Sequence, residues 1–119
     1  MRNFKQIKVW EKSHLLTLET YKLTKNYPKD ELYGLTSQLR RAASSISTNI
    51  AEGCGRHSDA EFCRFLIFAM GSANEVEYLN ILSHDLKYID QKKFNDLDLQ
   101  VNEIKKMLVG LYKRLTAKS

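Results

Sequence analysis

The sequence predicts an all-α fold, an up-down-up-down antiparallel four-helix bundle that forms a single domain over residues 1–119. One proline and five glycines among 119 residues leave few breaks, so the elements between them are long. Apolar residues recur at steps of three and four along four segments, which is the period of a helix with one buried face. The connections between these segments are short, and long helices joined by short connections pack as antiparallel neighbours.

The composition excludes several classes of protein. The chain is 43% hydrophobic and 28% charged, as in a globular domain rather than a disordered segment. Cys54 and Cys63 are too few to crosslink a small secreted fold, and the first residues lack the apolar core of a secretion signal. The longest apolar run, residues 65–70, is much too short to span a bilayer. We therefore expect a reduced, cytoplasmic protein without a membrane partner.

The first two helices are expected over residues 9–26 and 29–53. The first ends before Pro28, because a residue that precedes proline is pushed out of the helical region. The second begins beside Pro28, which suits a first helical turn, and ends at Gly53, a natural left-handed cap. The apolar positions of the second helix are Leu32, Leu35, Leu39, Ala42, Ile46 and Ile50.

Residues 38–53 read QLRRAASSISTNIAEG and contain many side chains that are unfavourable inside a helix. Serine, threonine and asparagine compete with the helix for backbone hydrogen bonds. Small side chains also let a neighbouring helix approach closely, and the third helix carries a matching strip: Ala69, Gly71, Ser72 and Ala73. We therefore expect tight packing between the second and third helices to stabilise this segment.

The third helix is expected over residues 58–86, with Ser58 and Glu61 at the spacing of a capping box. It carries two apolar stripes, and a helix that is apolar on two sides is buried on two sides. The first stripe consists of Phe62, Phe65, Leu66, Ala69, Ala73 and Val76. The second consists of Phe68, Met70, Tyr78 and Ile81. Because a four-helix monomer buries one broad face of each helix, the second stripe is predicted to form a subunit interface.

The fourth helix is expected over residues 91–116. Asp90 is placed to cap its N-terminus, and Ile89 and Phe94 have the spacing of a hydrophobic staple. Its apolar seam alternates steps of three and four: Phe94, Leu97, Val101, Ile104, Leu108, Leu111 and Leu115. Such a seam keeps one face of the helix against its neighbours over several turns.

The formal net charge of +5 is unevenly distributed along the chain. Residues 1–28, 29–57, 58–89 and 90–119 carry +4, +1, −3 and +3. Basic side chains at the end of the last helix complement its macrodipole, or they form a basic rim that contacts phosphates. The candidate nucleic-acid contacts are Arg40, Arg41, Lys105, Lys106, Lys113 and Arg114. No helix-turn-helix, RNA-recognition strand motif or zinc finger accompanies them.

A structural role for the two arginines competes with that hypothesis. Arg40 and Arg41 lie on an inner helix, where a charge is tolerated only when it is paired. The carboxylates available on inner helices are Glu52, Glu75 and Glu77. Pairing between these groups across the bundle would turn residues 38–53 into a packing and pairing element, and the lysines near the C-terminus would then be the stronger nucleic-acid candidates.

The residues that could carry catalysis or hold a metal form incomplete sets. The serines at 44, 45 and 47 have no histidine nearby to activate a nucleophile. Cys54, His57 and Cys63 lack a fourth ligand for a structural zinc ion. A di-iron bundle needs two Glu-x-x-His motifs, and only Glu11 with His14 fits. We expect no enzymatic activity, no cofactor, no metal and no small-molecule substrate.

The order of several motifs resembles a bacterial family over nearly the whole chain. The matching residues are Trp10, residues 33–43 (YGLTSQLRRAA), Ser45-Ile46, residues 49–53 (NIAEG), Gly71-Ser72, Glu75 and Glu77. In these motifs the chain resembles the four-helix-bundle proteins of 23S ribosomal RNA intervening sequences. One departure is visible: the family usually has Leu-Gly-Tyr-Ile before its last helix, where this chain has Leu86-Lys87-Tyr88-Ile89.

The resemblance implies an all-helical bundle that assembles as a ring-like homopentamer and is often encoded within ribosomal RNA gene inserts. Related bundles are accessory proteins of diversity-generating retroelements, in which a basic pentamer engages nucleic acid and a reverse transcriptase. The resemblance therefore implies RNA or DNA, a reverse transcriptase and further copies of the chain as partners. It transfers no catalytic residue.

Two functions remain open from the sequence. The first is a non-enzymatic, nucleic-acid-associated accessory or scaffold protein that acts as a basic homo-oligomer. The second is an oligomeric protein-interaction module without nucleic-acid binding, in which the charges serve solubility and pairing. Removing nucleic acid from a pulldown with nuclease separates the two, because only a partner held through nucleic acid is then lost.

Overall fold

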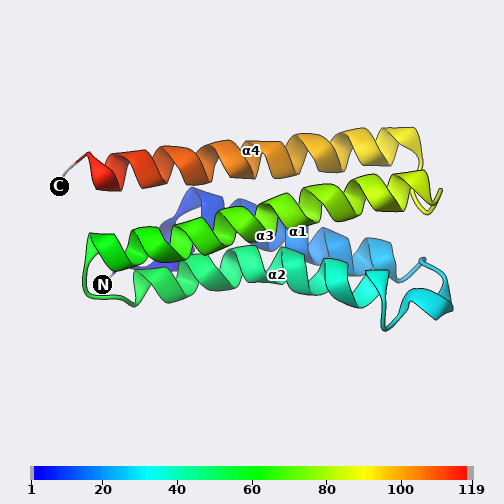
Figure 1. Ribbon diagram of the computed structural model, residues 1–119, viewed down its shortest axis with the longest axis horizontal. Helices are drawn as coiled ribbons and strands as arrows, with labels where there is room; N and C mark the ends of the chain where they lie inside the picture. The colour runs from blue at the N-terminus through cyan, green and yellow to red at the C-terminus, as the bar shows by residue number, and fades with distance from the viewer. Residues whose placement is uncertain (1, 118–119) are drawn as a thin grey trace.

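A computed structural model describes residues 2–117, which form the predicted all-α four-helix bundle. Its long helices are α1 (Lys8–Thr24), α2 (Leu35–Cys54), α3 (Asp59–Asp85) and α4 (Gln91–Thr116). Two short 3-10 turns, η1 (Phe4–Gln6) and η2 (Lys29–Glu31), precede α1 and α2. The bundle measures 46 × 23 × 20 Å, and consecutive helices are joined at alternating ends (Figure 1).

The four helices of the bundle pack against one another to different extents. α2 packs on α1 and α3, and α3 packs on α4, whereas the backbones of α1 and α3 do not approach each other closely. The contact between α1 and α4 is sparse and is supplemented by ion pairs. Lys93 Nζ lies 2.6 Å from Glu19 Oε2, and Lys12 Nζ lies 2.9 Å from Glu103 Oε1. α1 is therefore held mainly by α2, and ion pairs supplement its contact with α4.

The second helix begins later than the predicted residue 29, so its predicted start is wrong. η2 ends at Glu31, and Gly34 adopts a non-helical backbone (φ −115°, ψ −112°) before α2 begins at Leu35. The Glu31 carboxylate explains the break, because it accepts hydrogen bonds from the Leu35 backbone N–H at 3.2 Å and from the Tyr88 hydroxyl at 2.9 Å. Leu32, predicted to face the core, is consequently exposed.

The predicted left-handed cap at Gly53 is also wrong. α2 continues through Gly53 to Cys54, and within residues 2–117 no glycine has a positive φ. Gly53 is buried against α3, where an added Cβ would lie 2.7 Å from Cδ1 of Phe62 and 3.0 Å from Cβ of Phe65. This glycine is needed for the close approach of two helices rather than for a turn.

The predicted helix caps of α3 and α4 are confirmed. Ser58 Oγ accepts a hydrogen bond from the Glu61 backbone N–H at 3.1 Å, and Asp90 Oδ1 accepts one from the Lys93 N–H at 2.8 Å. Between these helices Lys87 has a φ of 65°, which confirms that it occupies the left-handed position of the family's glycine. A non-glycine residue there costs about 1 kcal/mol.

The core contains most of the predicted α4 seam, with Phe94 and Leu111 partly buried against it, and the first α3 stripe except Phe65, which is only partly buried. Its fully enclosed large side chains include Phe62, Leu66, Leu97, Ile104 and Leu108. The small residues of α2 and α3 pack closely, with Ala43, Ala69 and Ala73 at 0% exposure. The Ser72 hydroxyl donates to Ser45 Oγ at 3.0 Å across this contact. Gly71 is the exception in the predicted strip, because an added Cβ there would meet nothing within 4 Å.

Candidate nucleic-acid interface

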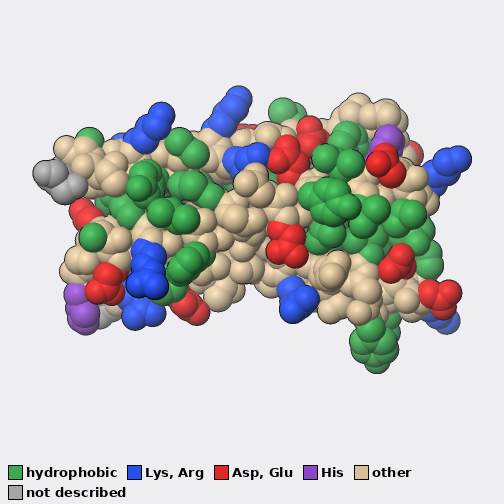
Figure 2. Space-filling view, in the orientation of Figure 1, with side chains coloured by type: hydrophobic (Ala, Val, Ile, Leu, Met, Phe, Trp, Pro, Cys, Tyr) green, Lys and Arg blue, Asp and Glu red, His purple; other side chains and the backbone are tan. Residues whose placement is uncertain are grey.

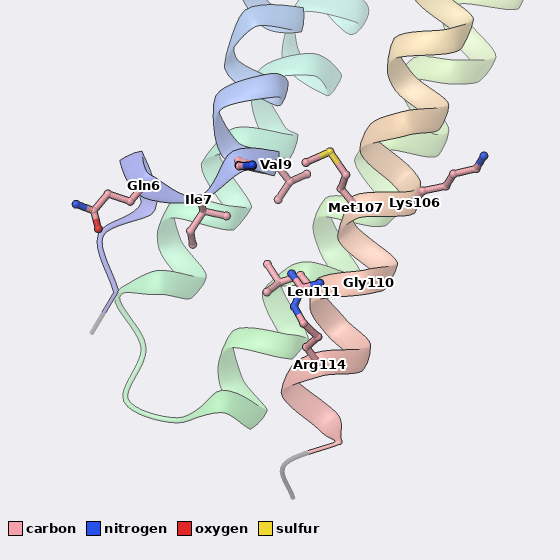
Figure 3. A pocket seen from close by; sticks show the side chains of 9 residues that line it. Gln6, Ile7, Val9, Lys106, Met107, Gly110, Leu111 and Arg114 are labelled. Carbon is pink, nitrogen blue, oxygen red and sulfur yellow. The ribbon is translucent and has the colours of Figure 1, made fainter.

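A hollow of about 470 Å³ lies where the start of α1 faces the last turns of α4 (Figure 3). Its walls are formed by Gln6, Ile7, Lys8, Val9, Lys106, Met107, Gly110, Leu111 and Arg114. The amphipathic pattern of α4 turns Met107 and Leu111 toward the bundle, so that apolar side chains form the floor. Gly110 adds no side chain, which leaves the space open.

Three cations surround this floor. Lys8 comes from α1, and Lys106 and Arg114 come from α4. In Figure 3 the Arg114 guanidinium bends back along α4 toward Leu111, whereas Lys106 extends away from the hollow. Over residues 2–117 none of the three makes an ion pair, and neither does the exposed Lys113 on α4. We call Lys8, Lys106, Lys113 and Arg114 the basic end.

The first turn of α1 adds to the positive potential of the basic end. Its N-cap residue, Ile7, makes no side-chain hydrogen bond, so the first backbone N–H groups of α1 have no side-chain acceptor there. The N-terminus of a helix carries a partial positive charge that favours anions. Glu11 is the acidic side chain in this turn and offsets part of that charge.

Lys105, although predicted as a nucleic-acid contact, is bound within the bundle. Its Nζ lies 2.7 Å from Oε1 of Glu77 on α3, and Asn102 donates a hydrogen bond to the other carboxylate oxygen at 3.1 Å. The hydrogen bond from Lys105 lowers the pKa of Glu77, and partial burial opposes this shift. Glu77 therefore pairs with Lys105 on α4, rather than with Arg40 or Arg41 as predicted.

Arg40 lies away from the basic end and holds the C-terminal turn of α1. Its Nε donates to Thr24 Oγ1 at 2.9 Å and its guanidinium donates to the Tyr21 carbonyl at 3.4 Å. The guanidinium also lies 4.7 Å from the centre of the Tyr21 ring. These are neutral partners, so the predicted carboxylate pairing of Arg40 is replaced by a contact between α2 and α1.

Arg41 is exposed on the other side of α2. It borders a shallow polar hollow of about 440 Å³ together with Ser44, Ser45, Thr48 and Glu75. In the described part of the chain neither Arg41, Glu75 nor the exposed Glu52 forms an ion pair. The predicted pairing of Arg41 with these carboxylates is thus absent from the structure, and Arg41 is an accessible cation apart from the basic end.

The second α3 stripe lies on the outside of the bundle. Phe68, Tyr78 and Ile81 are exposed, and Met70 is partly buried against the core. Figure 2 shows hydrophobic side chains gathered over α3 and the neighbouring edge of α4. The sequence pattern did not single out a second group of exposed apolar residues, namely Leu15, Leu18 and Tyr21 on α1.

The incomplete metal and nucleophile sets are not brought together. His14 stacks on Trp10 with ring centres 5.1 Å apart. Burial raises the pKa of the thiols of Cys54 and Cys63, which disfavours the reactive thiolate. Among residues 2–117 no three His, Cys, Asp or Glu side chains form a group that could hold a metal ion. Within the same range no helix has the length and apolar character needed to cross a membrane.

The fold unites Lys8 with the two α4 cations, a combination that the sequence analysis missed. Lys8 is about a hundred residues from Lys106 in the chain, and only the return of α4 past the start of α1 brings them to one hollow. The available signal was the +4 balance of residues 1–28, which matches the +3 of residues 90–119. Charge balance alone could not tell which residues meet.

Comparison with known proteins gives two matches. The model of a family described as 23S rRNA-intervening sequence protein matches residues 5–110. A crystal structure of a protein with unknown function from the S23 ribosomal protein family of Bacteroides thetaiotaomicron VPI-5482 has 28% sequence identity and a TM-score of 0.82. That similarity covers 88% of this chain and 95% of the other. No curated protein matches the sequence.

Proposed function

The chain belongs to the family of 23S rRNA-intervening sequence proteins, and from that premise we propose that it is a non-enzymatic accessory protein that binds nucleic acid as a homo-oligomer. The observation that carries the proposal is the basic end, where Lys8, Lys106, Lys113 and Arg114 make no ion pair within residues 2–117. The proposal places the protein in the cytoplasm, where ribosomal RNA is found.

The basic end suits phosphates better than bases. Its cations come from two helices around a mainly apolar floor, and the uncapped start of α1 adds a partial positive charge. Cations that meet phosphates release counterions, so affinity falls as salt rises. Repetition in a homo-oligomer, such as the homopentamer that the family resemblance implies, would present several copies of the basic end to one polyanion and strengthen weak contacts through avidity.

The test compares two charge-matched double variants. Lys106→Glu with Arg114→Glu reverses two charges of the basic end, and Lys29→Glu with Lys92→Glu reverses two exposed charges elsewhere. Binding to a short fluorescent duplex RNA is followed by anisotropy over a range of salt concentrations. We expect the first variant to bind more weakly and to lower the salt slope by about two, while the second keeps most of the affinity. An equal loss of RNA affinity in both variants would contradict the assignment of the basic end as the nucleic-acid-binding surface.

A protein-interaction module without nucleic-acid binding is the second candidate, favoured by the exposed apolar residues of α1 and α3. A pulldown with and without nuclease treatment separates the candidates. A partner that remains after nuclease, including a reverse transcriptase, supports direct protein contact. A partner lost with the RNA or DNA supports the proposed function.

A further inference from the structure

The hollow of the basic end has an apolar floor, and phosphate binding leaves this floor without a role. Ile7, Met107 and Leu111 line it and are partly buried against the core. Phosphates are held by cations and hydrogen-bond donors, to which an apolar surface contributes nothing. The volume of about 470 Å³ lies within the range of pockets that enclose a small organic group. The floor therefore fits an apolar group.

The charged residues that line the hollow are all cations. They are Lys8 on α1 and Lys106 and Arg114 on α4, and among residues 2–117 no carboxylate lines the hollow. Along the two helices the acidic residues nearest to the lysines are Glu11 and Glu103, and Glu103 is engaged in an ion pair with α1. A ligand that matches both the floor and its surroundings is an apolar group attached to an anion.

Gly110 and Arg114 shape the α4 wall of the hollow. They are one turn apart, and Figure 3 shows the Arg114 side chain bending back along the helix. A Cβ at Gly110 would lie 3.7 Å from Arg114 Nη1, so the guanidinium lies beside the bare backbone of the glycine. Arg114 is exposed, and a guanidinium plane can stack on the face of a nucleobase.

A nucleic acid offers a ligand of this kind where a base is unpaired. In a duplex the charged backbone lies outside and the bases are stacked inside, so the cations reach phosphates and the floor reaches no base. A bulged or terminal base turns out of the stack at low cost, because no base pair is broken. Such a base has an apolar face and a phosphate beside it, which matches an apolar floor between cations.

We propose that the hollow of the basic end receives one unpaired base of a nucleic acid. The base lies on Met107 and Leu111 beneath the guanidinium of Arg114, and the neighbouring phosphates lie near Lys8 and Lys106. The inference rests on the nucleic-acid binding of the proposed function and names the preferred class of ligand. A strand with a bulge, a loop or a free end binds more tightly than a fully paired duplex.

Three fluorescent RNAs test the preference by anisotropy: a short duplex, the same duplex with one bulged adenosine, and the bulged duplex with that nucleotide made abasic. The abasic strand keeps the charge and the flexible joint of the bulge and lacks the base. We expect the protein to bind the bulged adenosine about tenfold more tightly than the paired duplex. The abasic strand should bind little better than the duplex.

A second measurement follows the base itself. The fluorescent adenine analogue 2-aminopurine, placed at the bulge, is quenched while it stacks on neighbouring bases. Its emission should rise on binding, because no aromatic side chain of the described residues lines the hollow. Unchanged emission would contradict the transfer of the base into the hollow.

Gly110→Leu fills the hollow without changing a charge. A Cβ has room at this position, and leucine favours a helix more than glycine does, so circular dichroism should report unchanged helix content. Gly71→Leu on α3 is the matched control, because an added Cβ there would meet nothing within 4 Å. We expect Gly110→Leu to bind bulged and paired RNA equally, with the salt slope of the wild type. Gly71→Leu should keep the wild-type preference.

The outcomes separate the inference from the proposed function. Equal binding of all three RNAs by the wild type would overturn the inference and leave the phosphate contacts intact. An abasic strand that binds as tightly as the bulged adenosine would also overturn it, because flexibility of the joint would then be the cause. A Gly110→Leu variant that retains the preference would place the base elsewhere and overturn it too. A wild type that binds none of the RNAs would instead reject the proposed function.

Discussion

The first and last helices of the bundle differ in the side chains that they bury. α4 turns a continuous apolar seam inward, including Leu97, Ile104 and Leu108, and its other sides are mainly charged or polar, with Leu99 and Val109 exposed among them. α1 buries four hydroxyl side chains beside Val9 and Leu16, and it leaves two leucines and a tyrosine outside. α4 is therefore held in the bundle by its apolar seam. α1 buries a mixed set of apolar and hydroxyl side chains, and part of its apolar surface faces outward.

The largest expected effect is on the α4 side of this comparison. Leu108→Ala removes a fully buried side chain from the seam and leaves a cavity. We expect the free energy of unfolding to fall by about 2–5 kcal/mol in urea titrations. Leu99→Ala on the exposed side of α4 is the control and should change it by less than about 0.5 kcal/mol. A loss below that level at Leu108 would contradict the assignment of the seam as the main stabilising element.

A smaller effect is expected where α1 is held by α2. Thr24→Val keeps the shape of a buried side chain and removes the hydroxyl that accepts the Arg40 Nε–H. We expect a loss of about 1–2 kcal/mol in unfolding free energy, because a hydrogen bond to a charged group is lost. In a double-mutant cycle, Arg40→Gln should have much less effect once Thr24 is valine. Strict additivity would show that the contact contributes nothing.

The ion pair between Glu77 and Lys105 should give a pH-dependent contribution. The pKa of Glu77 is lowered in the fold, so its contribution is fully present above the unfolded pKa and is lost as the pH falls through the folded value. We expect Glu77→Gln to cost about 0.5–1 kcal/mol near neutral pH and nothing well below pH 4. Unfolding midpoints at several pH values measure this. A cost that does not change with pH would exclude the ion pair as its source.

The smallest effect is expected at a buried hydroxyl of α1. Ser13 is fully buried and its hydroxyl donates to the Val9 carbonyl at 2.6 Å, a bond within its own helix. Because that carbonyl also accepts a helical backbone bond, Ser13→Ala should change the unfolding free energy by less than about 0.5 kcal/mol. Thermal unfolding of the purified variant is sufficient to check it. If Ser13→Ala lowered the unfolding free energy as much as Leu108→Ala does, the buried hydroxyl of Ser13 would be a major source of stability for α1.

Much of the fold was predictable because local signals agreed with packing. The alternating steps of the α4 seam and the caps at Ser58 and Asp90 depend on neighbours in sequence. The cap at Gly53 and the start of the second helix at residue 29 were predicted wrongly, because they depend on Phe62, on Phe65 and on the Glu31 carboxylate. A glycine at the end of a periodic run indicates a turn, and only the approach of α3 shows that it is a packing site instead.

The candidate site was less predictable than the fold for the same reason. The cations of α4 stood out in the sequence. In the structure, however, Lys105 forms an ion pair with Glu77, and Lys8, from the other end of the chain, lines the hollow with Lys106 and Arg114. The exposed leucines of α1 were not singled out, because no apolar face was assigned to the first helix from the sequence. A helical period shows which residues share a face, and the neighbouring helices decide which face is inside.

The Glu31 carboxylate has a consequence for how the bundle opens. It joins the loop before α2 to the loop before α4, since its two oxygens bind the Leu35 backbone and the Tyr88 hydroxyl. Unfolding of either loop breaks the anchor of the other, so the two should exchange their amide hydrogens as one cooperative unit. At the opposite end of the bundle, Arg2 and Asp59 form a separate ion pair at 2.6 Å. The two ends of the molecule can therefore fray independently of each other.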